Sequence, residues 1–207
     1  MRVKICGITD PRDAALAVEL GASAIGMVFW PSSPRYVDAA RAREIVAVLP
    51  PHVNAIGVFV NQTREAARIA GELRLAAVQM HGDETTEDYA NFRAPLIRAV
   101  AVRGEQTHAD AAAIPDWVTV LLDAHDPIKR GGTGRVIDWS VAAAIARIRP
   151  VYLSGGVNPD NVAAAINAVR PFAIDVSSGV ESAPGKKDPA KLRALFAAVA
   201  EGAHETR

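Results

Sequence analysis

The sequence predicts an α/β protein, a (β/α)8 barrel of eight parallel strands in one domain spanning residues 1–207. Short apolar or β-branched segments alternate with longer Ala-rich segments along the whole chain, and there are eight such units. No GxGxxG motif, typical of an open dinucleotide-binding sheet, is present. A length of 207 residues is near the minimum for eight units. We find no linker or change of composition that would divide the chain.

The expected strands are separated by roughly 20 to 30 residues, which leaves room for a helix and two loops in each interval. Only parallel strands need crossovers of this length. Alternation by itself is compatible with an open doubly wound sheet or a closed barrel, and the number of units favours the barrel. The strands are expected to begin near Val3, Ala24, Asn54, Ala77, Leu96, Val118, Val151 and Ala173.

Several helix boundaries are marked by capping residues. In the first helix Leu16 and Leu20 have i,i+4 spacing, and Gly21 supplies a left-handed stop. A weaker helix is expected between Thr107 and Ile114, and the segment Ala124 to Arg135 is predicted to be a long loop. At three starts a capping side chain precedes a proline at the first helical position: Asp10-Pro11, Asn158-Pro159 and Asp188-Pro189.

Composition excludes several classes of function. Lys plus Arg and Asp plus Glu both number 23, so no net charge attracts nucleic acid or an anionic membrane. The N-terminus MRVKICGIT has no long apolar run, and no segment approaches the ~18 apolar residues of a spanning helix. One cysteine cannot form an internal disulfide, which suits a reducing compartment. We therefore expect a cytoplasmic protein without a nucleic-acid or membrane partner.

Chemistry in a barrel lies at the C-terminal ends of the strands. Alternation along a strand points Lys4 and Cys6 the same way, and likewise Leu121 and Asp123, so inward-facing Cys6 and Asp123 would converge over the barrel mouth. Polar residues and glycines gather at these ends: Cys6-Gly7, Trp30 to Arg35, Val60-Asn61, Gln79 to Gly82, Asp123, Ser154 to Gly156 and Ser177 to Gly179.

Each of these residues also has a structural interpretation. A lone cysteine ending an apolar strand is by type a small buried hydrophobe, and Asp123 is equally suited to capping a helix or anchoring a loop. Arg35 in isolation is a solvated surface charge, and His81 is a satisfied structural histidine. Residue type and position leave these alternatives open.

Seven motifs occur in order between Val3 and about Leu195: KICGIT, SPRYV, VQMHGDE, VLLD, a GGTG loop followed by DW, LSGG and DVSSGVE. Together they resemble the phosphoribosylanthranilate isomerases of tryptophan biosynthesis. The resemblance implies a barrel enzyme that converts N-(5-phosphoribosyl)anthranilate to 1-(2-carboxyphenylamino)-1-deoxyribulose 5-phosphate by an Amadori rearrangement. It implies a small phosphorylated substrate and no cofactor.

The resemblance also implies residue roles. Cys6 matches the general base that removes the C2' proton, and a thiol of ordinary pKa is a few per cent thiolate at pH 7. Asp123 matches the general acid that protonates the furanose ring oxygen, which requires a raised pKa or a proton held by burial. Arg35 matches the residue that binds the anthranilate moiety, and a guanidinium can grip a carboxylate bidentately. Gln79 and His81 are expected to line the site.

Two glycine-containing loops and one mobile segment complete the expected site. Backbone N–H groups after the seventh and eighth strands are expected to bind phosphate, at Gly155, Gly156, Ser178 and Gly179. The loop Lys129 to Arg135 is expected to act as a flap. Lys4 and Asp175 are expected to form a buried pair if the first and eighth strands are neighbours.

Two rival functions are also compatible with a barrel of this kind. A related isomerase of histidine biosynthesis uses a carboxylate where this chain has Cys6, and a catalytically silent phosphosugar-binding barrel would lack the base or the acid. The chain gives no metal-binding pattern, because it has no CxxC motif and its histidines are dispersed. The oligomeric state, monomer or homodimer, stays open.

Overall fold

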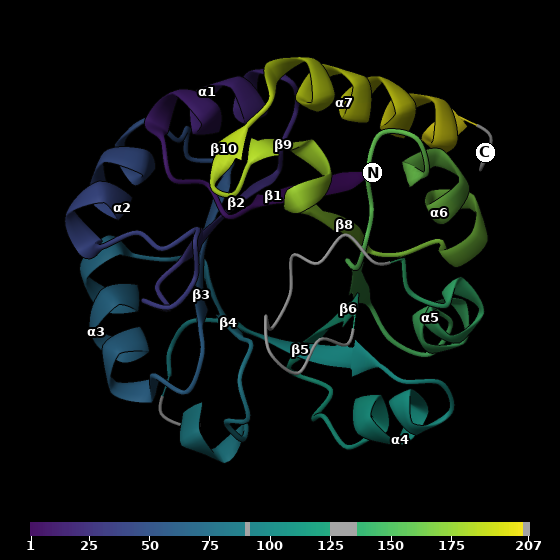
Figure 1. Cartoon of the computed structure of the whole chain (residues 1–207). Helices are drawn as coiled ribbons and strands as arrows, with labels where there is room; N and C mark the ends of the chain where they lie inside the picture. The colour runs from purple at the N-terminus through teal and green to yellow at the C-terminus, as the bar shows by residue number, and fades with distance from the viewer. Residues whose placement is uncertain (90–91, 125–135, 205–207) are drawn as a thin grey trace.

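Eight parallel strands close into a barrel in the order β1 to β8, and helices surround it (Figure 1). This computed structural model describes residues 1–89, 92–124 and 136–204. The (β/α)8 prediction is confirmed. The strands are β1 (Arg2–Cys6), β2 (Ala24–Val28), β3 (Asn54–Phe59), β4 (Ala77–Met80), β5 (Leu96–Val102), β6 (Thr119–Ala124), β7 (Val151–Leu153) and β8 (Ala173–Val176).

The predicted strand starts agree with this list, except that β1 begins one residue earlier and β6 one residue later. The helices are α1 (Pro11–Glu19), α2 (Ala39–Ala47), α3 (Thr63–Leu73), α4 (Gln106–Ala112), α5 (Trp139–Ala146), α6 (Val162–Val169) and α7 (Pro189–His204). Two 3-10 turns, η1 (Glu87–Tyr89) and η2 (Ser178–Val180), and an antiparallel hairpin of β9 (Glu181–Ala183) and β10 (Lys186–Lys187) complete the described chain. The weak helix predicted between residues 107 and 114 is confirmed as α4.

Two of the three predicted helix starts are confirmed. The Asp10 carboxylate accepts a hydrogen bond from Arg12 N at 2.8 Å, and the Asp188 carboxylate accepts one from Ala190 N at 2.8 Å. Each satisfies a backbone donor that the first helical turn leaves without a partner. At the other end of α1, Gly21 has φ +108°, so the predicted stop in a positive-φ conformation is also confirmed.

The predicted helix start at Asn158-Pro159 is wrong, because α6 begins at Val162. The Asn158 side chain accepts a hydrogen bond from Asp160 N at 2.8 Å, and this closes a turn ahead of the helix. An asparagine before proline supports such a turn as readily as a helix cap, since both use the same bond to a backbone N–H two residues on.

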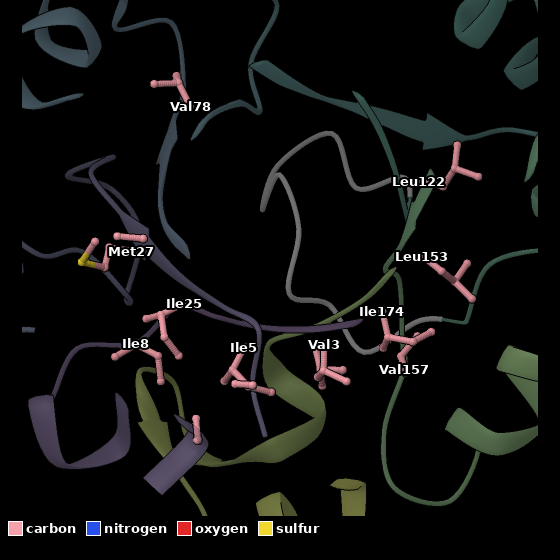
Figure 2. Packing of buried hydrophobic residues seen from close by; sticks show 14 of the residues in the cluster. Val3, Ile5, Ile8, Ile25, Met27, Val78, Leu122, Leu153, Val157 and Ile174 are labelled. Carbon is pink, nitrogen blue, oxygen red and sulfur yellow. The ribbon is translucent and has the colours of Figure 1, made fainter. Parts of the chain in front are cut away.

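Alternate residues of each strand serve two different cores. The outward side chains pack against the helices, as Val3, Ile5 and Ile174 do in Figure 2. The inward side chains form a smaller apolar cluster inside the barrel, made of Ala24, Ile56, Ala77, Ile97 and Leu121. Buried polar side chains, among them Lys4, Gln79, Asp123 and Asp175, also belong to the barrel strands.

The predicted Lys4–Asp175 pair is confirmed. The two residues are direct partners in the β1–β8 register, and Lys4 Nζ lies 2.7 Å from Asp175 Oδ1. Their side chains are 0% and 5% exposed. Strand pairing across the closure of the barrel therefore brings together two charges that are 171 residues apart in the chain.

We expect Lys4→Met and Asp175→Asn each to lower the free energy of unfolding by about 3–5 kcal/mol, because either change leaves the other charge buried without its partner. The double variant should cost less than the sum of the two. Urea denaturation of the four proteins gives the coupling free energy. Strict additivity would contradict a direct interaction.

Candidate active site

A cavity of about 470 Å³ opens at the C-terminal ends of the barrel strands. It brings together five residues that the sequence predicts for the site, from three strand ends and one loop: Cys6, Arg35, Gln79, His81 and Asp123. Ser154, Asp175 and Ser177 also line it. Cys6 and Asp123 stand on β1 and β6, three strands apart around the closed barrel, so the cavity lies between them.

Cys6 is the last residue of β1, and its side chain lines this cavity. The residue is 7% exposed, and burial raises the pKa of the thiol above its ordinary value, although the nearby Lys4 ammonium acts to lower it. A thiol in this environment is largely protonated near neutral pH. Gly26, its partner on β2, provides the space, because a Cβ there would lie only 2.8 Å from Cys6 Sγ.

Two contacts with described residues hold Asp123. Its Oδ1 accepts a hydrogen bond from Ala124 N at 2.8 Å, and Oδ2 lies 3.4 Å from His81 Nε2. On the other side of the imidazole, Gln79 Nε2 lies 2.9 Å from His81 Nδ1. With the Gln79 amide as donor to Nδ1, the ring proton belongs on Nε2, the nitrogen closer to Asp123. The row Gln79–His81–Asp123 thus crosses β4 and β6 at the cavity wall.

Arg35 lines the cavity with its guanidinium already bound on one edge. Its Nε and Nη2 donate to the two carboxylate oxygens of Glu181 at 2.8 and 2.7 Å. Burial by itself would raise the pKa of Glu181, but hydrogen bonds and charge from Arg35 and Lys187 hold it below its usual range. The side chain of Arg35 passes close to Gly7, which has φ +71°. A Cβ at position 7 would lie 3.3 Å from Arg35 Cγ, so glycine leaves room for the arginine.

The β9–β10 hairpin connects Arg35 to the strand ends. Lys187 Nζ donates to Glu181 Oε1 at 2.9 Å, to the carbonyl of Cys6 at 2.7 Å and to the carbonyl of Ser177 at 3.1 Å. Sequence reasoning missed Glu181 and Lys187. Glu181 is the last residue of the DVSSGVE motif, but the prediction drew only on the serine and glycine before it. No local sequence pattern marks Lys187.

The two expected phosphate loops lie against each other beside the cavity. Gly155 and Gly156 have φ of +75° and +72°, and the Gly156 carbonyl accepts a hydrogen bond from Asn161 Nδ2 at 3.0 Å. A Cβ on Gly179 would collide with the carbonyl of Val157, so glycine there permits the close approach. The cavity lining includes Ser154 and Ser177, which precede these loops, and does not include Gly155, Gly156, Ser178 or Gly179.

One more residue at a strand end does not contribute to this lining. Asn61 lies outside it and, with φ +55°, accepts a hydrogen bond from Asp83 N at 2.8 Å. The expected flap, Lys129 to Arg135, lies outside the described residues.

In the described ranges, no three His, Cys, Asp or Glu side chains gather where they could hold a metal ion. No helix among the same residues is long and apolar enough to span a membrane.

Comparison with known proteins gives one consistent result. The family model for N-(5'-phosphoribosyl)anthranilate (PRA) isomerase matches residues 3–198. The isomerase of that name from Pseudomonas fluorescens is 46% identical over 201 residues, which cover 96% of this chain and 95% of the relative.

Solved structures agree with the sequence relatives. The isomerase from Thermotoga maritima has a TM-score of 0.90 and 42% identity, and the alignment covers 97% of this chain and 99% of that one. A phosphoribosylanthranilate isomerase in complex with reduced 1-(o-carboxyphenylamino)-1-deoxyribulose 5-phosphate has a TM-score of 0.87 and 41% identity, with the same coverage. The chain belongs to the N-(5'-phosphoribosyl)anthranilate isomerase family.

Proposed function

We propose that this chain catalyses the Amadori rearrangement of N-(5'-phosphoribosyl)anthranilate to 1-(2-carboxyphenylamino)-1-deoxyribulose 5-phosphate, with Cys6 as general base and Asp123 as general acid. The observation behind the assignment is that the Cys6 thiol on β1 and the Asp123 carboxyl group on β6 line the same cavity. Two proton-transfer groups that flank one pocket can act on the two positions of a sugar where the reaction needs them.

Asp123 serves the first step. Its carboxyl group donates a proton to the ring oxygen of the furanose while the C1'–O bond breaks, and the anthranilate nitrogen supplies the electron pair that forms the Schiff base. The carboxylate that remains has the His81 Nε2–H group 3.4 Å away and the Ala124 N–H bond on Oδ1. Both donors stabilise the negative charge that this step leaves on Asp123.

Cys6 serves the second step. Its thiolate takes the proton from C2', the C–H electron pair forms the C1'=C2' bond, and the C=N electrons return to nitrogen. The resulting enolamine tautomerises to the ketone product. General acid–base catalysis by a positioned side chain contributes about 10²- to 10⁴-fold for each transfer.

Arg35 is proposed to bind the carboxylate of the anthranilate ring. Glu181 already holds the Nε/Nη2 edge of its guanidinium. A substrate carboxylate would therefore meet the edge formed by Nη1 and Nη2. Planar donors fixed in this way favour a planar carboxylate over other anions.

Phosphate is proposed to bind the backbone N–H groups of Gly155, Gly156, Ser178 and Gly179. We expect a product analogue without the phosphate group to bind at least 100-fold more weakly than the same analogue with it, because charge-assisted hydrogen bonds to several donors are lost together. Isothermal titration with the two analogues measures the difference. Equal affinities would contradict this assignment.

Freshly prepared phosphoribosylanthranilate tests the function directly. The purified protein is added to it, and loss of the substrate's fluorescence is followed together with formation of the carboxyphenylamino-deoxyribulose phosphate by chromatography. We expect complete conversion without added cofactor. A folded wild-type protein that forms no product would contradict the proposed function.

We also propose a cytoplasmic location, since the mechanism needs Cys6 as a thiol and a reducing compartment preserves it. The protein is proposed to act as a monomer or homodimer. A Thermotoga maritima relative is described as dimeric. In this chain the exposed side chains of Trp117, Ile148 and Phe172 precede the neighbouring strands β6, β7 and β8, and such an apolar surface is suited to a second copy.

A further inference from the structure

The inner face of β1 places a buried cation next to the cysteine. Lys4 and Cys6 are two residues apart on this strand, and their partners on β2 are Ala24 and Gly26. A Cβ on Gly26 would lie 2.8 Å from Cys6 Sγ and 3.1 Å from Lys4 Cε. The two side chains therefore converge over the space that Gly26 leaves empty.

Stability alone is a poor reason for a charge at this position. Removing an ammonium and a carboxylate from water costs several kcal/mol for each ion, and apolar residues of similar volume often replace a buried pair without loss. The neighbouring inward layer is apolar, with Ala24, Ile56 and Leu121. An apolar pair would continue that layer, so the Lys4–Asp175 pair calls for another explanation.

We propose that Lys4 is a positioning residue for catalysis, whose buried ammonium, shared with Asp175, stabilises the thiolate form of Cys6. The inference rests on the proposed role of Cys6 as base. Lys4 keeps its own proton throughout the cycle. It acts as a fixed charge beside the sulfur while the thiolate takes the C2' proton and becomes a neutral thiol.

The other charges around Cys6 come from several elements. Burial raises the pKa of Cys6, the charge of Lys4 opposes this most strongly, the charge of Asp175 adds to it and that of Lys187 opposes it. Burial would lower the pKa of Lys4, but Asp175 and Cys6 raise it above its ordinary value, so Lys4 stays charged. Among the described residues, the remaining ionisable groups of the cavity and its hairpin are Arg35, His81, Asp123, Glu181 and the exposed Lys186.

The two members of the pair should act on the thiol in opposite directions. In Lys4→Met the ammonium is gone, and the remaining Asp175 carboxylate disfavours a second negative charge nearby. In Asp175→Asn the thiolate takes the place of the lost carboxylate as counter-anion for Lys4. Simple loosening of the barrel would instead expose Cys6 in both variants and shift its titration the same way.

The chain is well suited to a thiol titration because it contains one cysteine. Thiolate absorbance near 240 nm is followed against pH, and each protein is paired with a blank carrying Cys6→Ala, which removes the signal of the tyrosines. We expect the thiol pKa to rise by one unit or more in Lys4→Met and to fall by one unit or more in Asp175→Asn. Each unit is a tenfold change in the thiolate fraction below the pKa.

A double variant with both Lys4→Met and Asp175→Asn keeps the test decisive if Lys4→Met alone fails to fold. It differs from Asp175→Asn only at residue 4, and its thiol pKa should be at least one unit higher than that of Asp175→Asn. An unchanged thiol pKa in this comparison, or a shift of both single variants in one direction, would overturn the inference. The titration requires no turnover, so a wild-type protein without isomerase activity would contradict the proposed function and leave this measurement intact.

Discussion

Replacing Cys6 by alanine is expected to lower the turnover of phosphoribosylanthranilate by about 10²- to 10⁴-fold, because no other group is proposed to take the C2' proton. The change removes one sulfur atom from the edge of a cavity and leaves the strand pairing of β1 unaltered. We therefore expect the variant to fold and to bind the reduced product analogue with affinity close to wild type. Steady-state kinetics and isothermal titration measure the two properties.

Ser182→Ala is a matched control for this experiment, since Ser182 is exposed on β9 and does not line the cavity. It should turn over substrate at the wild-type rate. Near-normal turnover in Cys6→Ala would reject the thiol as base. Cys6 would then be explained as a small buried side chain without a role in catalysis.

Replacing Asp123 by asparagine is expected to lower turnover by a similar factor, about 10²- to 10⁴-fold. Asparagine keeps the shape of the carboxyl group and still accepts the hydrogen bond from Ala124 N, but it has no acidic proton to give to the ring oxygen. Ring opening should become the slow step, whereas binding of the open-chain product analogue should change little. Single-turnover kinetics with the cyclic substrate measures ring opening.

Asp116→Asn is the corresponding control, because Asp116 is exposed and lies just before the N-terminal end of β6, the end opposite to Asp123. We expect it to behave as wild type. If Asp123→Asn also retained normal turnover, the proton on the ring oxygen would have to come from another group, and His81 beside it would be the first to examine.

The barrel was predictable because its signal repeats. Eight apolar runs at similar spacing gave the strands, and side-chain alternation gave the faces on which Lys4, Cys6 and Asp123 lie. The Lys4–Asp175 contact followed from the same two facts together with closure of the sheet. Asn158 was misread since capping a helix and closing a turn use the same local hydrogen bond.

The contacts that fix Arg35 could not be read from the sequence in the same way. Glu181 and Lys187 belong to a short hairpin outside the repeating pattern, and their partners Arg35 and Cys6 are distant in the chain. Nothing periodic predicts such contacts, because they depend on how a loop folds over the strand ends. The same holds for the row Gln79–His81–Asp123, in which only Gln79 and His81 are close in the sequence.

The most direct test of the proposed chemistry is a crystal structure of this protein with the reduced product analogue bound. We predict that Cys6 Sγ and an Asp123 carboxylate oxygen flank the ribulose chain, with Sγ near C2' at about 3–4 Å, the range in which proton transfer and near-attack contacts occur. An analogue whose C2' atom lies against other residues, with Cys6 or Asp123 out of reach of the sugar, would contradict the account.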